Sequence, residues 1–253
     1  KTTTSSMMGY ALLGAGVDPT MVVGGEVTAW EGNARLGQSD WFVAEADESD
    51  GSLVKLAPKI GIITNIELDH PDHYSTLDDV VAIFRQFAQQ TETVIASADC
   101  DTIARFIQPD VTYSVEIGSQ ADYTITDVVY GAGGTRAVIW ENGARLGILR
   151  LPVPGKHNLS NALAVNAAGR QMGLDFADLA GGLAKFEGVR RRFEQLGFYN
   201  GIHFIDDYAH HPSEIKATLS TASLLKTRDL ALGCTVKRVV AIFQPHRYTR
   251  TRD

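Results

Sequence analysis

The chain has 253 residues, 44% of them hydrophobic, and its 23 basic against 30 acidic side chains give a net charge of −7. This length is enough for one large or two ordinary domains with packed cores. The acidic balance argues against a general nucleic-acid-binding protein, which needs a basic face for phosphates. No apolar run approaches the roughly 20 residues of a membrane span. Cys100 and Cys234 form no C-x-x-C pattern and are interpreted as reduced thiols of a cytoplasmic protein.

Short apolar runs alternate with helical patterns in the first part of the chain, which is typical of an α/β sheet. A helix is predicted first, and Gly14 and Gly16 end it. A buried strand and a second strand rich in β-branched residues follow. The predicted elements, in chain order, are a helix at 2–13, strands at 41–47 and 60–66, a helix at 77–89, a strand at 93–97 and a short helix at 103–107.

The pattern changes between residues 121 and 151, where alternating apolar residues predict antiparallel strands with turns at 131–134 and 142–143. Helices are predicted at 158–172 and 176–186, and a domain boundary near 186–193. A strand at 201–207, a helix at 212–225 and a strand at 238–244 follow. The predicted fold class is therefore α/β, with a mostly parallel sheet that carries an antiparallel insertion.

Polar residues follow several of these strands, and ligands of parallel α/β sheets bind at the carboxyl ends of strands. The stretch "EADESD" closes the strand at 41–47, so that Glu45 leaves a buried strand. A carboxylate there suits Mg²⁺, which takes oxygen ligands and keeps nucleotide phosphates as partners. The alternative is a solvated acidic loop.

The stretch "TNIELDHPDHY" closes the strand at 60–66 and crowds six polar side chains into one loop. A helix N-cap and a zinc site are the alternatives here. His70 and His73 could bind zinc, although the pattern lacks the further histidines or cysteines of a closed zinc site.

The stretch "PGKHNLSNALA" places Asn158 and Asn161 on one face at the start of a helix. Two amides on one face can recognise a nucleobase edge. Helix capping by Asn158 is the alternative, and the sequence leaves both open.

Basic residues gather in "GVRRRF", "DDYAHHPSE" and "FQPHRYTRTRD" in a chain that is acidic overall. His210 and His211 precede a helix that starts at Pro212, and a helix N-terminus beside histidines and arginines suits an anion. The alternative is a set of surface arginines. The first residues, "KTTT", match the end of the phosphate-binding pattern G-x-x-x-x-G-K-[ST], or form an ordinary polar terminus.

Taken together and in this order, the seven stretches resemble the Mur ligase family over the whole chain. The resemblance implies a central ATP-binding domain of the P-loop type at 1–187 and a partial Rossmann-like C-terminal domain at 188–253. The family also has an N-terminal UDP-sugar-binding domain. We therefore expect the chain to be a fragment that lacks this domain, the first central strand and the glycines of the P-loop. As a fragment it is expected to bind Mg·ATP poorly and to be inactive.

The resemblance also implies residue roles. Lys1 corresponds to the lysine that holds the phosphates, with Thr2 and Thr3 beside it. Thr2 and Glu45 correspond to Mg²⁺ ligands, and His70 to the ligand of a second divalent ion, Mg²⁺ or Mn²⁺. Asn158 and Asn161 fall in the adenine-contacting motif, Arg191 and Arg192 in a phosphate-contacting one, and Asp207 matches a ribose contact. The residues matching those that meet the reacting groups are His210, His246, Arg247 and Arg250.

The implied activity is ATP-dependent ligation of L-alanine to the lactyl carboxylate of UDP-N-acetylmuramate, through an acyl phosphate, in peptidoglycan precursor synthesis. No lysine occurs between Lys59 and Lys156, so the carbamylated lysine of other family branches has no counterpart. This supports the alanine-adding branch. The alternatives are a ligase of the same family that adds a whole tripeptide, and a nucleotide-binding protein without ligase chemistry.

Overall fold

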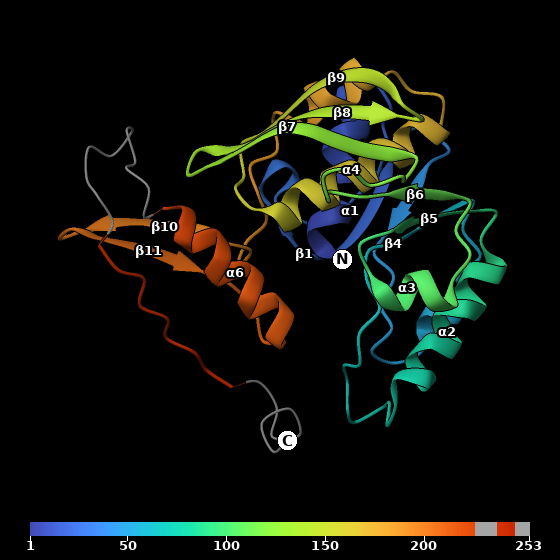
Figure 1. Ribbon diagram of the computed structural model, residues 1–253, viewed down its shortest axis with the longest axis horizontal. Coiled ribbons are helices and arrows are strands. Elements are labelled where there is room, and N and C mark those ends of the chain that lie inside the picture. The colour runs from blue at the N-terminus through green and yellow to red at the C-terminus, as the bar shows by residue number, and fades with distance from the viewer. Residues whose placement is uncertain (226–236, 246–253) are drawn as a thin grey trace.

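Two β-sheets and the helices between them form the larger part of the structure, a computed structural model that describes residues 1–225 and 237–245 (Figure 1). The first sheet has the order β2-β1-β3, with β3 parallel and β2 antiparallel to β1. The second has the order β4-β5-β6-β7-β8-β9, in which β4 to β7 are parallel and β7 to β9 antiparallel. The strands are β1 (Thr20–Val27), β2 (Gly32–Arg35), β3 (Phe42–Ala44), β4 (Ile60–Ile63), β5 (Thr93–Ser97), β6 (Val111–Tyr113), β7 (Tyr123–Gly131), β8 (Gly134–Glu141) and β9 (Ala144–Leu151).

Helices cover both sheets, and α1 and α4 lie at the centre. The helices of this part are α1 (Thr2–Gly14), α2 (Leu77–Gln90), α3 (Asp101–Phe106), α4 (Lys156–Gln171) and α5 (Phe176–Leu183), with short 3-10 turns at Thr28–Trp30 and Ser52–Lys55. The main core joins α1 and α4 to β1, β5 and the antiparallel strands through residues such as Met7, Leu12, Ile139 and Leu163, all fully buried. We call residues 1–187 the central unit.

A smaller unit follows, which we call the C-terminal unit. It contains the antiparallel pair β10 (Glu194–Tyr199) and β11 (Ile202–Asp206) and the helix α6 (Pro212–Leu224). Figure 1 shows this orange unit beside the central one. Its small apolar cluster contains Phe193, Ala222 and Leu225, whereas Phe198 and Phe204 of the hairpin are about half exposed, at 49% and 47%.

Most elements confirm the sequence predictions, including the fold class. The antiparallel insertion turns at Asn142 and Gly143, which both have positive φ, as a two-residue hairpin requires. Strands β1, β2, β6 and β10 were not predicted, because glycines, charges or short length hide their alternation. Among the described residues, no helix has the length and apolar character needed to cross a membrane.

Two strand predictions were wrong. The segment 41–47 is not a buried strand, since β3 covers only Phe42–Ala44 and Phe42 is 61% exposed. Among the described strands, β3 pairs only with β1, so its other edge is open. Residues 237–245 form no regular secondary structure, so the strand at 238–244 is absent, and Ile242 is 97% exposed. Apolar β-branched sequence forms a strand only where a neighbouring strand pairs with it.

Strands β3 and β4 end the two sheets and border the same groove. This groove has a volume of about 490 Å³ and is lined by both strands, by Met8 and Leu12 of α1, and by Phe87 of α2. The two sheets are therefore separate along this line and are held in place by α1 and α4.

The crossing of α1 and α5 depends on two glycines that face each other. A Cβ on Gly182 would lie 2.2 Å from the Tyr10 carbonyl oxygen, and one on Gly14 would lie 2.4 Å from Gly182 Cα. Real Cβ atoms do not come this close to backbone atoms, so the two helices can approach only because both residues lack a side chain.

We expect Gly182→Ala to destabilise the fold by about 1–3 kcal/mol, because it forces α1 and α5 apart. Gly181→Ala is the matched control: nothing lies within 4 Å of a Cβ there, and alanine favours a helix by about 0.5–1 kcal/mol over glycine. Urea unfolding of both variants checks this. Equal midpoints would show that the helix crossing tolerates a methyl group.

Candidate functional site

A polar cavity of about 390 Å³ lies where the two units meet, and both contribute side chains to its wall. The central unit provides the start of α1, the residues after β3 and the loop after β4. The C-terminal unit provides Arg192 and the segment before α6. Of the predicted site residues, the cavity brings together Lys1, Thr2, Glu45, His70, Arg192 and His210.

The carboxylate of Glu45 lies at the centre of the central unit's side of the cavity. Its Oε1 accepts a hydrogen bond from Thr2 Oγ1 at 2.8 Å, and its Oε2 accepts one from the Gly24 backbone N–H at 2.5 Å. A Cβ on Gly24 would lie 2.8 Å from Glu45 Oε1. Glycine in β1 therefore lets the carboxylate approach the backbone, and it places Glu45 directly beside the Thr2 hydroxyl.

The side chain of Lys1 lies between two carboxylates of the loop after β3. Its Nζ donates to Glu48 Oε2 at 2.8 Å and to Asp47 Oδ2 at 3.1 Å. Partial burial alone would lower the pKa of Lys1, but Glu48 and Asp47 outweigh it and raise that pKa. The lysine is thus held as a cation at the edge of the cavity.

His70 lies across the cavity in the loop that follows β4. Its Nε2 is 3.4 Å from Glu48 Oε1 and 3.6 Å from Asp69 Oδ2, so Glu48 bridges Lys1 and His70. Its backbone is left-handed, with φ of 56°. Its Nδ1 is buried and accepts or donates no hydrogen bond among the described residues. A buried nitrogen of this kind is a candidate metal ligand.

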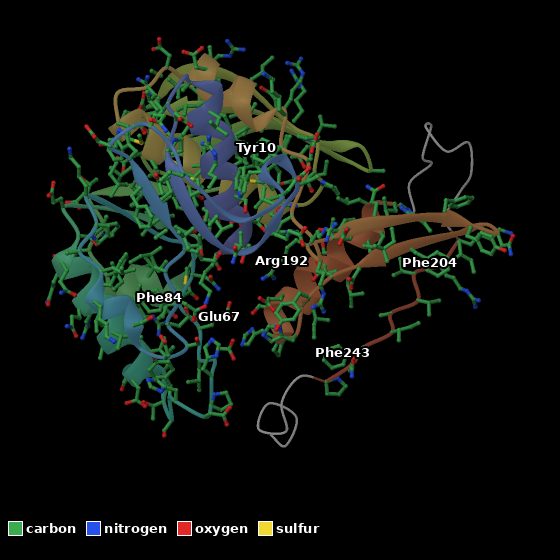
Figure 2. All side chains as sticks on the ribbon, turned by 180° about the vertical axis from the view of Figure 1, so that it is seen from behind. Tyr10, Glu67, Phe84, Arg192, Phe204 and Phe243 are labelled. Carbon is green, nitrogen blue, oxygen red and sulfur yellow. The ribbon has the colours of Figure 1, made fainter. Side chains whose placement is uncertain are left out.

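The C-terminal unit contributes cations and an aromatic ring. The guanidinium groups of Arg191 and Arg192 lie 4.7 and 5.5 Å from the centre of the Tyr208 ring, and the His210 ring meets it edge-on at 5.0 Å. Figure 2 shows Arg192 at the junction of the two units. Arg192 lines the cavity, whereas Arg191 is exposed outside it and lies 3.6 Å from Asp206.

The remaining predicted residues lie outside the cavity. Thr3 is not part of its wall, and Asn161 accepts a hydrogen bond from Thr4 Oγ1 at 3.0 Å. Asp207 accepts from the backbone N–H groups of Phe193 and Ala209, both at 2.7 Å. The predicted residues His246, Arg247 and Arg250 lie outside the described residues.

Asn158 does not cap α4, so the capping alternative was wrong. Gly155 is the N-cap residue, and Asn158 is buried inside the first turn, where its Nδ2 donates to the Pro154 carbonyl at 2.7 Å. The helix begins earlier than predicted because Gly155, with φ of 106°, provides the turn that starts it. The adenine-contacting role of Asn158 and Asn161 stays a prediction.

Sequence reasoning missed several residues of the cavity. Gly24 lines the cavity and has no side chain, so that the Glu45 carboxylate can lie against the β1 backbone. Gly25, outside the cavity wall, leaves room for Thr2 in the same way. Glu48, Glu67 and Ser213 were visible in the quoted stretches, yet their meeting in one cavity depends on the packing of separate elements.

The side chains of the cavity suit Mg²⁺ better than a closed zinc site. No group of three or more His, Cys, Asp or Glu side chains capable of holding a metal is found among the described residues. A zinc site of the closed type is therefore not present there. Mg²⁺ requires less from the protein, since it keeps water and phosphate ligands. The adjacent oxygens of Thr2 and Glu45, with the unpartnered His70 Nδ1 nearby, fit that mode of binding.

Family comparisons agree with this geometry. Residues 1–169 match the Mur ligase middle domain, and residues 191–247 match the Mur ligase, glutamate ligase domain. Because the first match alone covers more than half of the residues, the chain belongs to the Mur ligase family.

Curated relatives are similar over the whole chain. The UDP-N-acetylmuramate–L-alanine ligase of Nostoc punctiforme is 61% identical over 251 residues, which is 99% of this chain and 51% of that protein. That of Thermosynechococcus vestitus is 59% identical over 254 residues, 100% of this chain and 53% of that protein. The chain thus spans about half the length of the curated relatives it matches.

Solved structures show the same similarity. The crystal structure of UDP-N-acetylmuramate–alanine ligase from Thermotoga maritima has a TM-score of 0.79 at 33% identity, covering 90% of this chain and 53% of that one. A tripeptide-adding ligase structure from Neisseria meningitides has a TM-score of 0.65 at 26% identity, covering 75% of this chain and 64% of that one.

The network around Lys1 predicts an acidic titration of Asp47. Partial burial opposes the shift, but hydrogen bonds from Ser49 and the charge of Lys1 lower the pKa of Asp47 from 3.8 to about 2. A folded-state pKa below the unfolded value stabilises the fold above about pH 3.8, and this contribution is lost as the pH falls through about 2.

We expect Lys1→Gln to raise the pKa of Asp47 toward 3.8, because the cation is removed while Ser49 still donates. Carboxyl carbon NMR, with Asp47→Asn for assignment, measures the shift. Asp50 is the control, since its lowered pKa comes from Ser52. An unchanged Asp47 titration would contradict the role of Lys1.

Proposed function

We propose that this chain forms the ATP-binding and part of the catalytic machinery of a UDP-N-acetylmuramate–L-alanine ligase. The reaction is the ATP-dependent ligation of L-alanine to the lactyl carboxylate of UDP-N-acetylmuramate, in peptidoglycan precursor synthesis in the cytoplasm. ATP phosphorylates the carboxylate, and the alanine amine then displaces phosphate from the acyl phosphate. No nucleic acid or membrane partner is part of the proposal.

One observation carries the proposal: a single polar cavity collects Lys1, Thr2 and Glu45 from the central unit, and Arg192 and His210 from the C-terminal unit. Phosphoryl transfer spreads negative charge over oxygens, and catalysis depends on placing cations and donors where that charge develops. A cavity whose wall is formed by both units can supply both the cations and the hydrogen-bond donors. The named relatives support the choice of substrates.

Each predicted site residue has a specific role in this reaction. Lys1, which now donates to Asp47 and Glu48, supplies a cation for the phosphates and exchanges these partners for the more highly charged anion. Arg192 approaches the phosphates from the opposite side, and His210 faces the reacting carboxylate. We assign to His246, Arg247 and Arg250 the contacts with the carboxylate, the acyl phosphate and the amino acid, and to Asn158, Asn161 and Asp207 those with the nucleoside.

Thr2, Glu45 and His70 would hold divalent ions in this scheme. When bound, Mg²⁺ neutralises phosphate charge and orients the transferring group. Glu45 contributes a carboxylate that Gly24 and Thr2 already hold in place. His70, whose Nδ1 has no partner, is assigned to the second ion, Mg²⁺ or Mn²⁺.

The proposal predicts strict substrate dependence. When residues 1–253 replace the matching segment of the Nostoc punctiforme ligase, we expect phosphate release only with ATP, UDP-N-acetylmuramate and L-alanine together. A coupled phosphate assay, with the parent ligase as control, measures this. Equal release with a tripeptide would favour the tripeptide-adding activity, and release without any amino acid would favour a nucleotide switch.

In the same chimera we expect Glu45→Ala to lower kcat/KM on the order of a hundredfold, because it removes a metal-ligating carboxylate. Asp50→Ala is the matched control. Asp50 is exposed and accepts a hydrogen bond from the Ser52 backbone N–H at 2.9 Å, so its loss is expected to have little effect. Comparable losses for the two variants would identify the acidic stretch as a solvated loop.

A further inference from the structure

The units touch where Ala132 packs on the apolar cluster of the C-terminal unit and where Gly155 approaches Thr221 of α6. Two sets of polar contacts also join them, at separate places. Near the connection between them, Arg190 Nη1 lies 2.9 Å from Glu26 Oε2, and the Arg190 N–H donates to the Glu26 carbonyl at 3.3 Å. The second set lies on the cavity rim, where Glu67 and Leu68 of the loop after β4 meet His211 and Ser213 at the start of α6. The first set holds the connection itself against β1, and the packing at Ala132 and Gly155 involves the later part of α6. The second set is the one that joins the two walls of the cavity.

The second set is a closed triangle of hydrogen-bonding groups. Ser213 Oγ donates to Glu67 Oε2 at short range. His211 Nδ1 lies 2.6 Å from Ser213 Oγ and 3.2 Å from Glu67 Oε2. Because a serine hydroxyl has one proton and gives it to the carboxylate, the histidine must donate to the serine. Its Nε2 lies 3.4 Å from the Leu68 carbonyl oxygen.

Each side of the triangle is also fixed within its own unit. Glu214 Oε2 accepts hydrogen bonds from the backbone N–H groups of His210 and His211, at 3.1 and 3.2 Å. On the other side, Asn65 Nδ2 donates to Glu67 Oε1 at 3.3 Å. Figure 2 shows Glu67 on the side of the central unit that faces the C-terminal unit. A shift of the triangle would therefore move the residues that are adjacent to it in each loop.

Those neighbours are site residues. His210 directly precedes His211, and His70 follows Glu67 by three residues in the same loop, and both line the cavity. A change in the triangle, whose three residues lie on the wall of the same cavity, would therefore alter the separation of the two cavity walls.

We propose that Glu67, His211 and Ser213 form a latch that holds the C-terminal unit closed over the cavity. They are positioning residues: they fix the distance between the walls that carry His70 and His210. The purpose of closure rests on the proposed function, because a site built from two units excludes water only when closed. The latch itself is a property of the chain and can be measured without nucleotide.

The test measures the distance between the units by pulsed electron paramagnetic resonance on the whole chain. After both native cysteines are replaced by serine, spin labels are attached through Gln89→Cys on α2 and Lys216→Cys on α6, two exposed positions. Ser213→Ala and Glu67→Ala are compared with the labelled reference. The control is Glu116→Ala, which removes an exposed ion pair with Lys156 that lies wholly within the central unit.

We expect one dominant distance in the reference and the control. In Ser213→Ala and Glu67→Ala the population at longer distances rises roughly tenfold, since charge-assisted bonds of this kind shift an equilibrium by about that factor. The double variant opens no further than Glu67→Ala alone, because the two groups act together. The thermal midpoint of the central unit stays unchanged, which separates opening from unfolding.

An unchanged distance distribution in Ser213→Ala would overturn the latch, even if Glu67→Ala fails to fold. Fully additive opening in the double variant would also overturn it. Neither result depends on ligation. A chimera that releases no phosphate would contradict the proposed function but would not contradict the latch.

Discussion

The carboxylate of Glu45 joins three segments on which the rest of the site depends. It accepts one hydrogen bond from the first turn of α1 and one from the backbone of β1, while its own chain position follows β3. A partly buried carboxylate is stable only when such donors surround it. The requirement for donors thus fixes where α1 starts relative to the first sheet, and with it the position of Lys1 and Thr2.

Charge balance then organises the remainder of the central unit's side. Lys1 neutralises Asp47 and Glu48, and Glu48 also approaches His70. Without the lysine, these carboxylates and Glu45 would repel one another across the cavity. The same balance explains the proposed chemistry, because the lysine and Arg192 are cations that a phosphate group can attract away from weaker partners.

The separation into two units gives the site its second wall. The C-terminal unit has a small apolar core of its own, on which Ala132 of the central unit packs. Polar contacts at Glu26 and at Glu67 also join it to the central unit. Interfaces of this kind allow relative motion of the units. A site divided between such units can admit substrates when open and can assemble its cations when closed.

Short stretches of sequence were enough to predict the fold class, most helices, the antiparallel insertion and the types of residue in the site. These follow from local periodicity, turn chemistry and the placement of polar residues after strands, which are all visible in short stretches. Glu45 could be selected in this way, and His70 was one of several polar residues in its loop. The choice of Thr2 and of His70 as metal ligands depended on the resemblance to the family, and all three line one cavity.

Which of these residues meet depends on the packing of segments that are distant in the sequence. Strand pairing is non-local, so the sequence could not show that β3 has an open edge or that residues 237–245 remain unpaired. The need for glycine at position 24 is visible only when Glu45 is seen beside it. The contact of Glu67 with Ser213 joins residues 146 positions apart. Local patterns report which chemistry a chain carries, whereas the packing of distant segments decides where that chemistry is brought together.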